Sequence, residues 1–172
     1  MASTYDRAVM RAELGRDEGV RLRVYRCTAG KLTIGCGRNL DDVGIRPGEA
    51  AALGLTLRGV IANGITSAQS DALLDGDIDA AEADLDCALP WWRRLDPVRQ
   101  RVLLNMCFNL GIGRRASPGR PARGLLGFSN TLALIQSGQY AAAASNMLMS
   151  KWARQVGLRA VRLSVMMKEG AK

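Results

Sequence analysis

The sequence predicts an α+β fold that is mostly helical, with its strands confined to one lobe. Three observations predict it: an alternating stretch near residues 21–38, a long capped helix that begins near residue 66, and an almost wholly apolar helical stretch before Leu110. The 172 residues are 48% hydrophobic and 23% charged, as is usual for soluble globular proteins. The length suits one domain, or two small lobes that share a hinge.

The N-terminal segment predicts a helix rather than a secretory leader. Tyr5, Ala8, Val9 and Ala12 follow helical spacing, and glycines on either side of position 18 place the end of the helix near Glu18. The segment is too polar for a signal peptide or a membrane anchor. We therefore expect the protein to be made in the cytoplasm.

A β-hairpin is predicted to follow this helix. Leu22 and Val24 alternate with polar residues, as do Leu32 and Ile34, and residues 28–30 (Thr-Ala-Gly) supply the turn. After a loop at about residues 41–48, an alanine- and leucine-rich segment predicts helical structure up to residue 63.

A long helix is predicted between Thr66 and Pro90. Thr66 and Gln69 form a capping box at its start, and the proline stops it after about 22 residues, roughly 33 Å. Acidic residues recur on one face of this helix, and we interpret them as a solvated stripe. They are Asp71, Asp75, Asp79, Glu82 and Asp86.

The C-terminal half predicts a helical bundle. Residues 95–110 predict a central buried helix, because residues 102–110 are apolar on nearly all sides. Residues 111–124 (GIGRRASPGRPARG) predict a mobile cationic loop. Ser129 is expected to cap a short helix that ends at Gly138, and two more helices are expected over residues 140–150 and 158–168.

Composition narrows the chemistry. The chain has no histidine and its four cysteines form no CxxC pair, so we expect no metal site, no cofactor and no Ser-His-Asp machinery. Acid–base work must fall to carboxylates, thiols, lysines or tyrosines. Residues 91–172 hold 14 Lys/Arg against 2 Asp/Glu, a net of +12, which favours an anionic partner.

One spacing points to a specific chemistry. Glu18 is followed after eight residues by Cys27 and after five more by Thr33. This pattern resembles the catalytic residues of the phage lysozyme (endolysin) family, glycoside hydrolase family 24. The likeness extends along most of the chain, through GITSAQSDALLDGDIDAA, LDPVRQRVLLNMCFNLG and GFSNTLALIQSGQYAAAASNMLMSKWARQ.

The resemblance implies a muramidase that hydrolyses the β-1,4 bond between N-acetylmuramic acid and N-acetylglucosamine. Glu18 would protonate the glycosidic oxygen, and Thr33 would help to hold the water. The sequence departs from the family at Cys27, where an aspartate is usual. Cys27 could act as a thiolate base, as a covalent nucleophile or as a polar residue that lines the site, and we favour direct attack by water with inversion.

The resemblance also implies one lysozyme domain over residues 1–172. Its N-terminal lobe would span about 16–64, an inter-lobe helix about 66–89 and a helical C-terminal lobe about 91–172, on which residues 1–15 would pack.

Four residues would support the site, and three of them, Arg159, Arg38 and Asp77, follow from the same resemblance. Arg159 would pair with the catalytic glutamate across the cleft. Arg38, where the family has a histidine, would form a salt bridge with Asp77 that persists at all accessible pH values. Asn105 would satisfy backbone groups or line the cleft wall.

The expected partner is peptidoglycan, with a separate holin-type membrane pore needed for release from the host cytoplasm to the wall. We expect a monomer, with no stable membrane insertion and no nucleic acid. A lytic transglycosylase and a non-catalytic wall-binding relic are the alternatives. A basic nucleic-acid binder would explain the positive half, but the sequence lacks a groove-reading motif.

Overall fold

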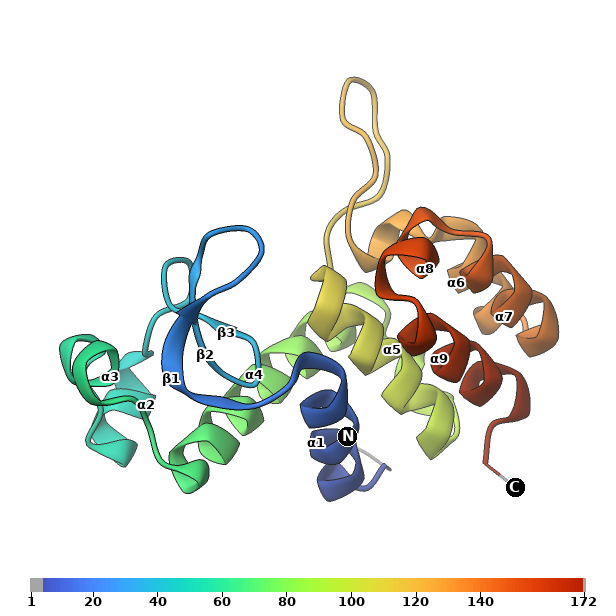
Figure 1. Cartoon of the computed structure of the whole chain (residues 1–172). Coiled ribbons are helices and arrows are strands. Elements are labelled where there is room, and N and C mark those ends of the chain that lie inside the picture. Colours follow the sequence, from blue (N-terminus) through green and yellow to red (C-terminus); the bar gives the residue numbers. More distant parts are fainter. Residues whose placement is uncertain (1–4, 172) are drawn as a thin grey trace. The chain divides into compact units, whose positions relative to one another are not determined.

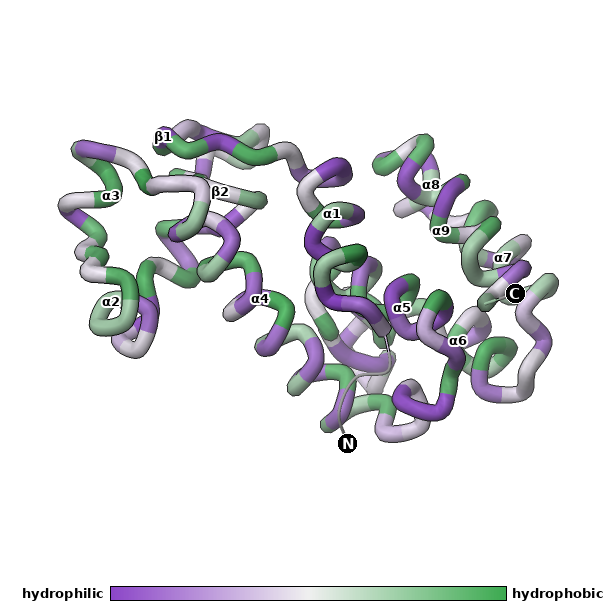
Figure 2. Tube along the Cα trace, turned by 90° about the horizontal axis from the view of Figure 1, so that it is seen from below, coloured by the Kyte–Doolittle hydropathy of each residue, from purple (hydrophilic) through white to green (hydrophobic). Residues whose placement is uncertain are grey.

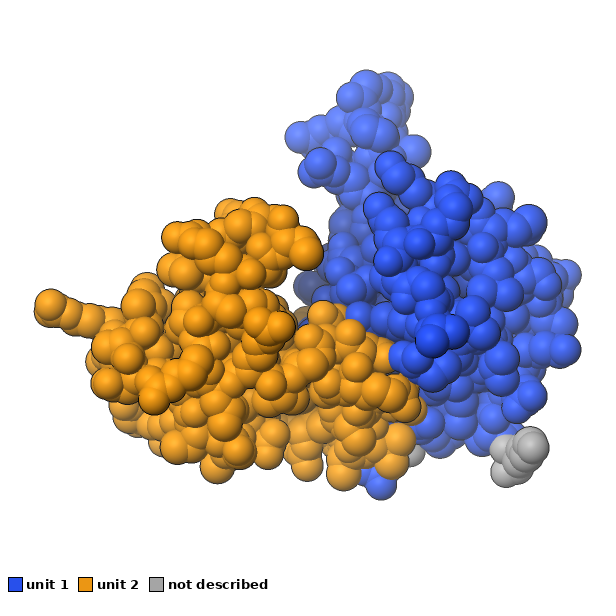
Figure 3. All heavy atoms as spheres, in the orientation of Figure 1, with its two compact units in different colours: residues 1–6, 81–172 blue, residues 7–80 orange. Residues whose placement is uncertain are grey.

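The computed structural model describes residues 5–171, and the chain divides into two compact units (Figure 3). Unit 2 holds residues 7–80, and unit 1 holds the residues before position 7 and those from 81 onward. The mostly helical α+β class predicted from the sequence is confirmed. The predicted lobe boundaries stay a prediction. No helix within residues 5–171 is both long enough and apolar enough to cross a membrane.

Unit 2 contains a three-stranded antiparallel sheet and helices before and after it (Figure 1). The elements are α1 (Arg7–Glu18), β1 (Arg21–Arg26), β2 (Leu32–Gly35), β3 (Arg38–Asn39), α2 (Pro47–Leu53), α3 (Leu57–Asn63) and the start of α4 (Ser67–Ala88). The predicted hairpin is confirmed as β1 and β2. The sequence did not reveal β3, because two residues are too few for an alternation to show.

Strand β2, which carries Thr33, is the middle strand of the sheet. Thr33 on β2 lies opposite Tyr25 on β1 and opposite Asn39 on β3. Ile34, the next residue of β2, is fully buried. The core beneath the sheet consists of Ile34, Leu40, Leu55, Val60, Ile65 and Leu73.

Helix α1 is confirmed, but it buries a different face from the one predicted. Met10 and Leu14, four residues apart, are fully buried, whereas Val9 is 40% exposed. The predicted apolar face rested largely on two alanines, Ala8 and Ala12. An alanine side chain has too little apolar area to decide which face of a helix is buried.

Helix α4 begins and ends as predicted. The Thr66 amide donates to Gln69 Oε1 (2.8 Å), and the Gln69 amide donates to Thr66 Oγ1 (3.1 Å), so the capping box is present. The helix spans 22 residues, from Ser67 to Ala88. Figure 2 shows hydrophobic and hydrophilic stretches alternating along its trace, as expected for a helix with one apolar face.

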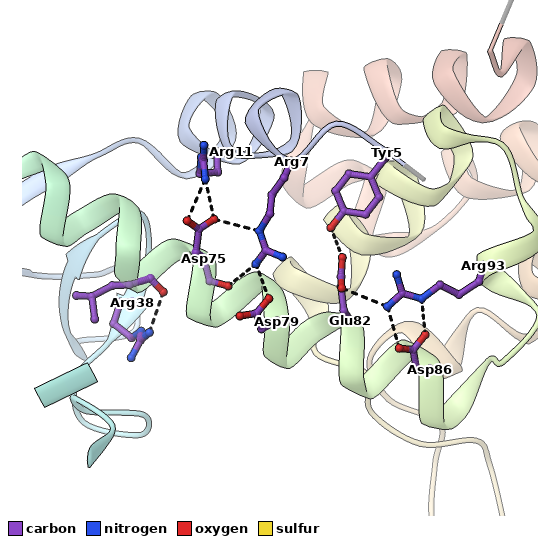
Figure 4. A network of polar contacts seen from close by, with 10 residues as sticks. Tyr5, Arg7, Arg11, Arg38, Asp75, Asp79, Glu82, Asp86 and Arg93 are labelled. Atoms are coloured by element: carbon purple, nitrogen blue, oxygen red, sulfur yellow. Dashed lines mark hydrogen bonds and ion pairs between the residues drawn. The ribbon is translucent and has the colours of Figure 1, made fainter. Parts of the chain in front are cut away.

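The predicted solvated stripe on α4 is present only in part: Asp71, Asp79 and Asp86 are exposed, whereas Asp75 and Glu82 are partly buried. In unit 2, Asp75 accepts from Arg7 Nε (3.1 Å) and from Arg11 Nη1 (2.9 Å), and Asp79 accepts from Arg7 Nη2 (2.5 Å) (Figure 4). These carboxylates therefore connect α4 with α1.

Glu82 and Asp86, the two residues of the predicted stripe that belong to unit 1, are also bound. Glu82 accepts from the Tyr5 hydroxyl and from Arg93 Nη2 (3.2 Å) (Figure 4). Asp86 accepts from Arg93 Nε and from the Trp92 indole, both at 2.7 Å. Hydrogen bonds from Arg93 and Trp92 hold the pKa of Asp86 below its usual value, although burial opposes them.

Unit 1 is helical around the predicted central helix. Its elements are η1 (Trp92–Arg94), α5 (Pro97–Leu110), η2 (Leu125–Gly127), α6 (Ser129–Gln136), α7 (Tyr140–Leu148), α8 (Lys151–Val156) and α9 (Leu158–Glu169). The stretch 102–107 of α5 is buried, as predicted. Ser129 is the first residue inside α6, so the cap position falls on Phe128 instead.

Residues 111–124 form a hairpin, which corrects the prediction of an irregular loop. Arg114 and Arg123 exchange two backbone hydrogen bonds of 3.0 Å, and nearer the tip Ser117 and Arg120 exchange two more (3.0 and 2.9 Å). Gly113 has a φ of +71°, and a Cβ there would lie 2.0 Å from the Arg123 carbonyl oxygen. Gly113, one of the glycines that predicted a loop, therefore allows two backbone segments to approach closely.

Candidate active site

Glu18 is the last residue of α1, and its side chain is partly buried. The next residue, Gly19, has a φ of +72° and closes the helix with a hydrogen bond to the Gly15 carbonyl (3.0 Å). Gly37, which follows β2, lies against the carboxyl group: a Cβ at this position would be 3.4 Å from Glu18 Oε2. The glutamate is therefore held between a helix end and the turn after β2.

Cys27 follows β1 and opens the turn of the hairpin. Its amide donates to the Lys31 carbonyl (3.0 Å), and its carbonyl accepts from the Gly30 amide (2.8 Å). The side chain is partly exposed. Hydrogen bonds from the Ala29 and Lys31 amides, and one from the Thr33 hydroxyl, stabilise the thiolate and lower the pKa of Cys27. The tight turn thus makes this thiol more acidic than an ordinary cysteine.

Thr33 is buried at the centre of the sheet. Its Oγ1 donates to the Lys31 carbonyl (3.1 Å) and lies within hydrogen-bonding reach of Cys27. A hydroxyl carries one proton, so it serves either the carbonyl or the thiolate at a given moment. Thr33 and Cys27 are therefore brought together, as their spacing in the sequence indicated.

Tyr25 belongs to the same cluster, although no sequence pattern singled it out. Burial raises the pKa of Tyr25 and the charges of Cys27 and Glu18 raise it further, while Arg21 opposes them. The Arg21 guanidinium lies over its ring at 4.5 Å. The available signal was strand periodicity, since residues 25 and 27 fall on one side of an extended chain.

Arg38 and Asp77 form the predicted salt bridge, with 2.7 Å between Nε and Oδ2. The Arg38 side chain is only 2% exposed and also donates to both carboxylate oxygens of Glu49 (2.6 and 2.9 Å). Arg46 binds the same two carboxylates from a more exposed position. Burial raises the pKa of Glu49, but the hydrogen bonds from Arg38 and Arg46 outweigh it and lower that pKa to about 2.

Arg159 and Asn105 meet inside unit 1. The buried Arg159 donates from Nε to Asn105 Oδ1 (2.8 Å) and from Nη2 to the Asn105 carbonyl (3.3 Å). This contact fixes the guanidinium of α9 against α5. The expected pairing of Arg159 with Glu18 joins residues of the two units and stays a prediction.

Unit 1 also contains a hollow of about 550 Å³ with aromatic and amide side chains in its wall. Phe128 and Trp152 meet edge to face in it (ring centroids 5.9 Å apart), and the Trp152 indole donates to Asn109 Oδ1 (2.8 Å). Thr131 and Asn146 add a hydroxyl and an amide. Arg123 and Lys151 also line this hollow, so it offers two cations beside its aromatic and amide groups.

Unit 2 thus combines a carboxyl group, an acidic thiol and a buried hydroxyl around one small sheet. Among the residues that the structure describes, no group of three or more side chains suits a metal ion. Glycosidic bonds are usually cleaved by a carboxylic acid that donates a proton and a second group that activates or positions water. The fold and this set of groups define a lysozyme-type glycoside hydrolase.

Comparisons with known proteins agree with this class. The family model for phage lysozyme matches residues 15–165, and the chain belongs to the phage lysozyme family. It is 28% identical over 163 residues to the "Probable T4-type lysozyme 1" of Dictyostelium discoideum, with 90% of each chain covered. It is also 28% identical over 167 residues to the pre-baseplate central spike protein Gp5 of Enterobacteria phage T4, covering 91% of this chain but only 27% of that protein. The chain is therefore a lysozyme-type peptidoglycan hydrolase.

Proposed function

We propose that the chain hydrolyses the β-1,4 bond between N-acetylmuramic acid and N-acetylglucosamine, with Glu18 as the general acid. The observation that carries the proposal is the placement of Glu18 at the end of α1, against Gly37 and close to the Tyr25 and Cys27 cluster. Membership of the phage lysozyme family supports the reaction class. The bond and the residue roles are the proposal.

In the proposed reaction, Glu18 donates its proton to the glycosidic oxygen while the bond from that oxygen to the anomeric carbon breaks. Positive charge develops on the sugar ring, and a water molecule adds from the opposite face. The proton of that water passes to the Cys27 thiolate, and the Thr33 hydroxyl orients the water oxygen. Each cleavage therefore adds one water to the products and inverts the anomeric configuration.

Mass spectrometry of digested peptidoglycan tests the reaction type. We expect reducing-end muramic acid products that are one water heavier than the 1,6-anhydro products of a lytic transglycosylase, because water is the final acceptor in this scheme. Anhydro products would assign the chain to the transglycosylases. A failure to release any fragment from purified sacculi that the protein binds would favour a non-catalytic wall-binding role.

The pH dependence of activity tests Cys27 as the base. The active form needs a protonated Glu18 and a Cys27 thiolate at the same time, so wild-type activity should rise and then fall with pH, with the lowered pKa of Cys27 setting one limb of the profile. Cys27→Asp should move the optimum of this profile to acidic pH, because a free aspartate has a pKa near 3.9. Cys27→Ser should lower the rate by roughly 10²-fold or more, since a hydroxyl is a far weaker base.

Two results would contradict this role. One is full activity in Cys27→Ser, and the other is a pH profile that stays the same in Cys27→Asp. Cys87→Ser is the matched control, because this cysteine lies on the exposed side of α4, outside the site. It should leave both the rate and the profile unchanged.

The cellular side of the proposal is lysis of the host at the end of phage infection. The enzyme would act on the wall in the periplasm after release from the host cytoplasm through a membrane pore formed by another, holin-type protein. The phage lysozyme family supports this role. Cells that express the chain without such a pore should stay intact until their membrane is permeabilised.

A further inference from the structure

The arginine hairpin, residues 112–124, projects from the surface of unit 1 (Figures 1 and 3). It carries four arginines and no acidic residue, and the side chains from position 115 to 123 are all exposed. Six backbone hydrogen bonds hold it, including those that join Gly111 to Leu125 and Ile112 to Leu126 at its base. A cationic arm with a defined shape is therefore presented to solvent.

The base of the hairpin concentrates positive charge without a counter-charge. Arg114 and Arg123 lie directly opposite each other, an arrangement of like charges that is unfavourable unless an anion is bound. Both line a hollow with Lys151 and Gln155, and no carboxylate is among its described lining residues. Within residues 5–171, the buried Nε of Arg114 has no hydrogen-bond partner. This hollow has the composition of an anion site.

Exposed apolar side chains continue this surface. Met149, which is 69% exposed, shares a hollow with Arg123 and Lys151. Its neighbour Leu148 shares a second, mostly apolar hollow with Leu158, which is 75% exposed. Cationic and large apolar side chains therefore lie next to each other on unit 1.

We propose that the arginine hairpin and this neighbouring surface dock unit 1 on a membrane that contains anionic lipids. Guanidinium groups bind lipid phosphates through paired charge-assisted hydrogen bonds, and Met149 and Leu158 contact the boundary of the acyl region. The contact is peripheral, because no helix within residues 5–171 is long and apolar enough to span the membrane. It does not involve Glu18 and does not depend on the hydrolytic mechanism.

The composition of the hairpin favours lipid over nucleic acid. The hairpin contains no aromatic residue on which a base could stack and no asparagine or glutamine that could read a base edge. The exposed Met149 and Leu158 suit a lipid boundary and gain nothing from a phosphodiester backbone.

Vesicle co-sedimentation of the full chain tests the proposal. We expect binding to vesicles of phosphatidylcholine with 30% phosphatidylglycerol at low salt, weak binding to phosphatidylcholine alone, and release at high salt. The double variant Arg115→Gln/Arg120→Gln should bind about 25-fold more weakly, since each cation near an anionic bilayer contributes about fivefold. Both side chains are exposed at the arm, so the variant should fold normally.

A variant with the same net charge separates the hairpin from a general charge effect. Arg58→Gln/Arg94→Gln removes two exposed arginines elsewhere and should keep binding within about twofold of the wild type. A Leu158→Ser variant should weaken binding to anionic vesicles without abolishing it. Hydrolysis of purified sacculi is measured in parallel, so that a failed enzyme and a failed membrane contact remain distinguishable.

Three outcomes would overturn the proposal. One is equal binding to neutral and anionic vesicles, and another is an equal loss of binding in both double variants. The third is the absence of vesicle binding together with hairpin-dependent binding to duplex DNA or to sacculi. That result would make nucleic acid or the wall itself the partner of the arm. Binding to sacculi is measured with the Glu18→Gln protein, which should not digest them.

Discussion

Glu18→Gln is expected to lower kcat on peptidoglycan by about 10²- to 10⁴-fold, the usual contribution of a positioned general acid. Glutamine has nearly the same shape as glutamate, so it should keep the contact with Gly37 while losing the proton that the leaving oxygen needs. Binding of the variant to purified sacculi should therefore stay close to that of the wild type. Release of soluble fragments, followed under saturating substrate, measures the rate.

Two further variants sharpen this test. Glu169→Gln removes the same charge from an exposed position at the end of α9 and should keep the wild-type rate. Glu18→Asp keeps the carboxylic acid but shortens the side chain by one methylene. Its rate should therefore lie between those of the wild type and Glu18→Gln. Retention of more than a tenth of the wild-type rate in a folded Glu18→Gln protein would remove Glu18 from the role of acid.

The parts of the fold that follow from neighbouring residues were predictable. The capping box of Thr66 and Gln69 fixes the start of α4 by contacts within four residues. The turn at residues 28–30 and the alternation on both sides of it determine the β1–β2 pairing. The spacing from Glu18 to Thr33 indicated a site only through its resemblance to the phage lysozyme family, and the roles of these residues stay a prediction.

Features that depend on distant partners were not predictable from these patterns. The row of carboxylates on α4 looks the same in the sequence whether it faces water or the arginines of α1 and η1. The hairpin at residues 112–124 depends on Gly113, whose role becomes visible only when the Arg123 carbonyl is placed beside it. Tyr25 was overlooked because its relation to Glu18 depends on how α1 meets the sheet.

The ion pairs around Arg38 include one partner that was predicted from the sequence and one that was not. A resemblance in sequence indicated the partner Asp77, but it gave no sign of Glu49, which lies in a short helix eleven residues after Arg38. Together the four charges of Arg38, Arg46, Glu49 and Asp77 balance, and the Gly44 and Leu73 carbonyls accept the remaining protons of the guanidinium (3.1 and 3.0 Å). The network is therefore a buried, satisfied unit and not an isolated pair.

Arg38→Ala is expected to lower the free energy of unfolding by about 3–5 kcal/mol, because it leaves buried carboxylates without their main counter-charge. Arg46→Ala is the matched control. Arg46 binds the same two carboxylates, but its side chain is 35% exposed, so its loss should cost only about 1 kcal/mol or less. Urea unfolding of both variants at pH 7 measures the difference. Equal losses would contradict a dominant role for burial.

The pH dependence of stability gives an independent test of the same network. The pKa of Glu49 is about 2 in the folded protein against 4.5 for a free glutamate, so its contribution is complete above about pH 4.5 and is lost as the pH falls through 2. On the alkaline side the wild type should stay level, because the pKa of Arg38, which burial lowers, is raised overall by Glu49 and Asp77.

An Arg38→His variant should behave in the opposite way above neutral pH. A histidine that gains carboxylate partners has a raised pKa, so its contribution is complete below about pH 6.5 and is lost as the pH rises through the folded pKa. Urea unfolding between pH 5 and 9 should therefore give a declining curve for the variant and a level one for the wild type. Superimposable curves would show that the charge of Arg38 does not stabilise the fold, and that its stabilising effect lies in packing alone.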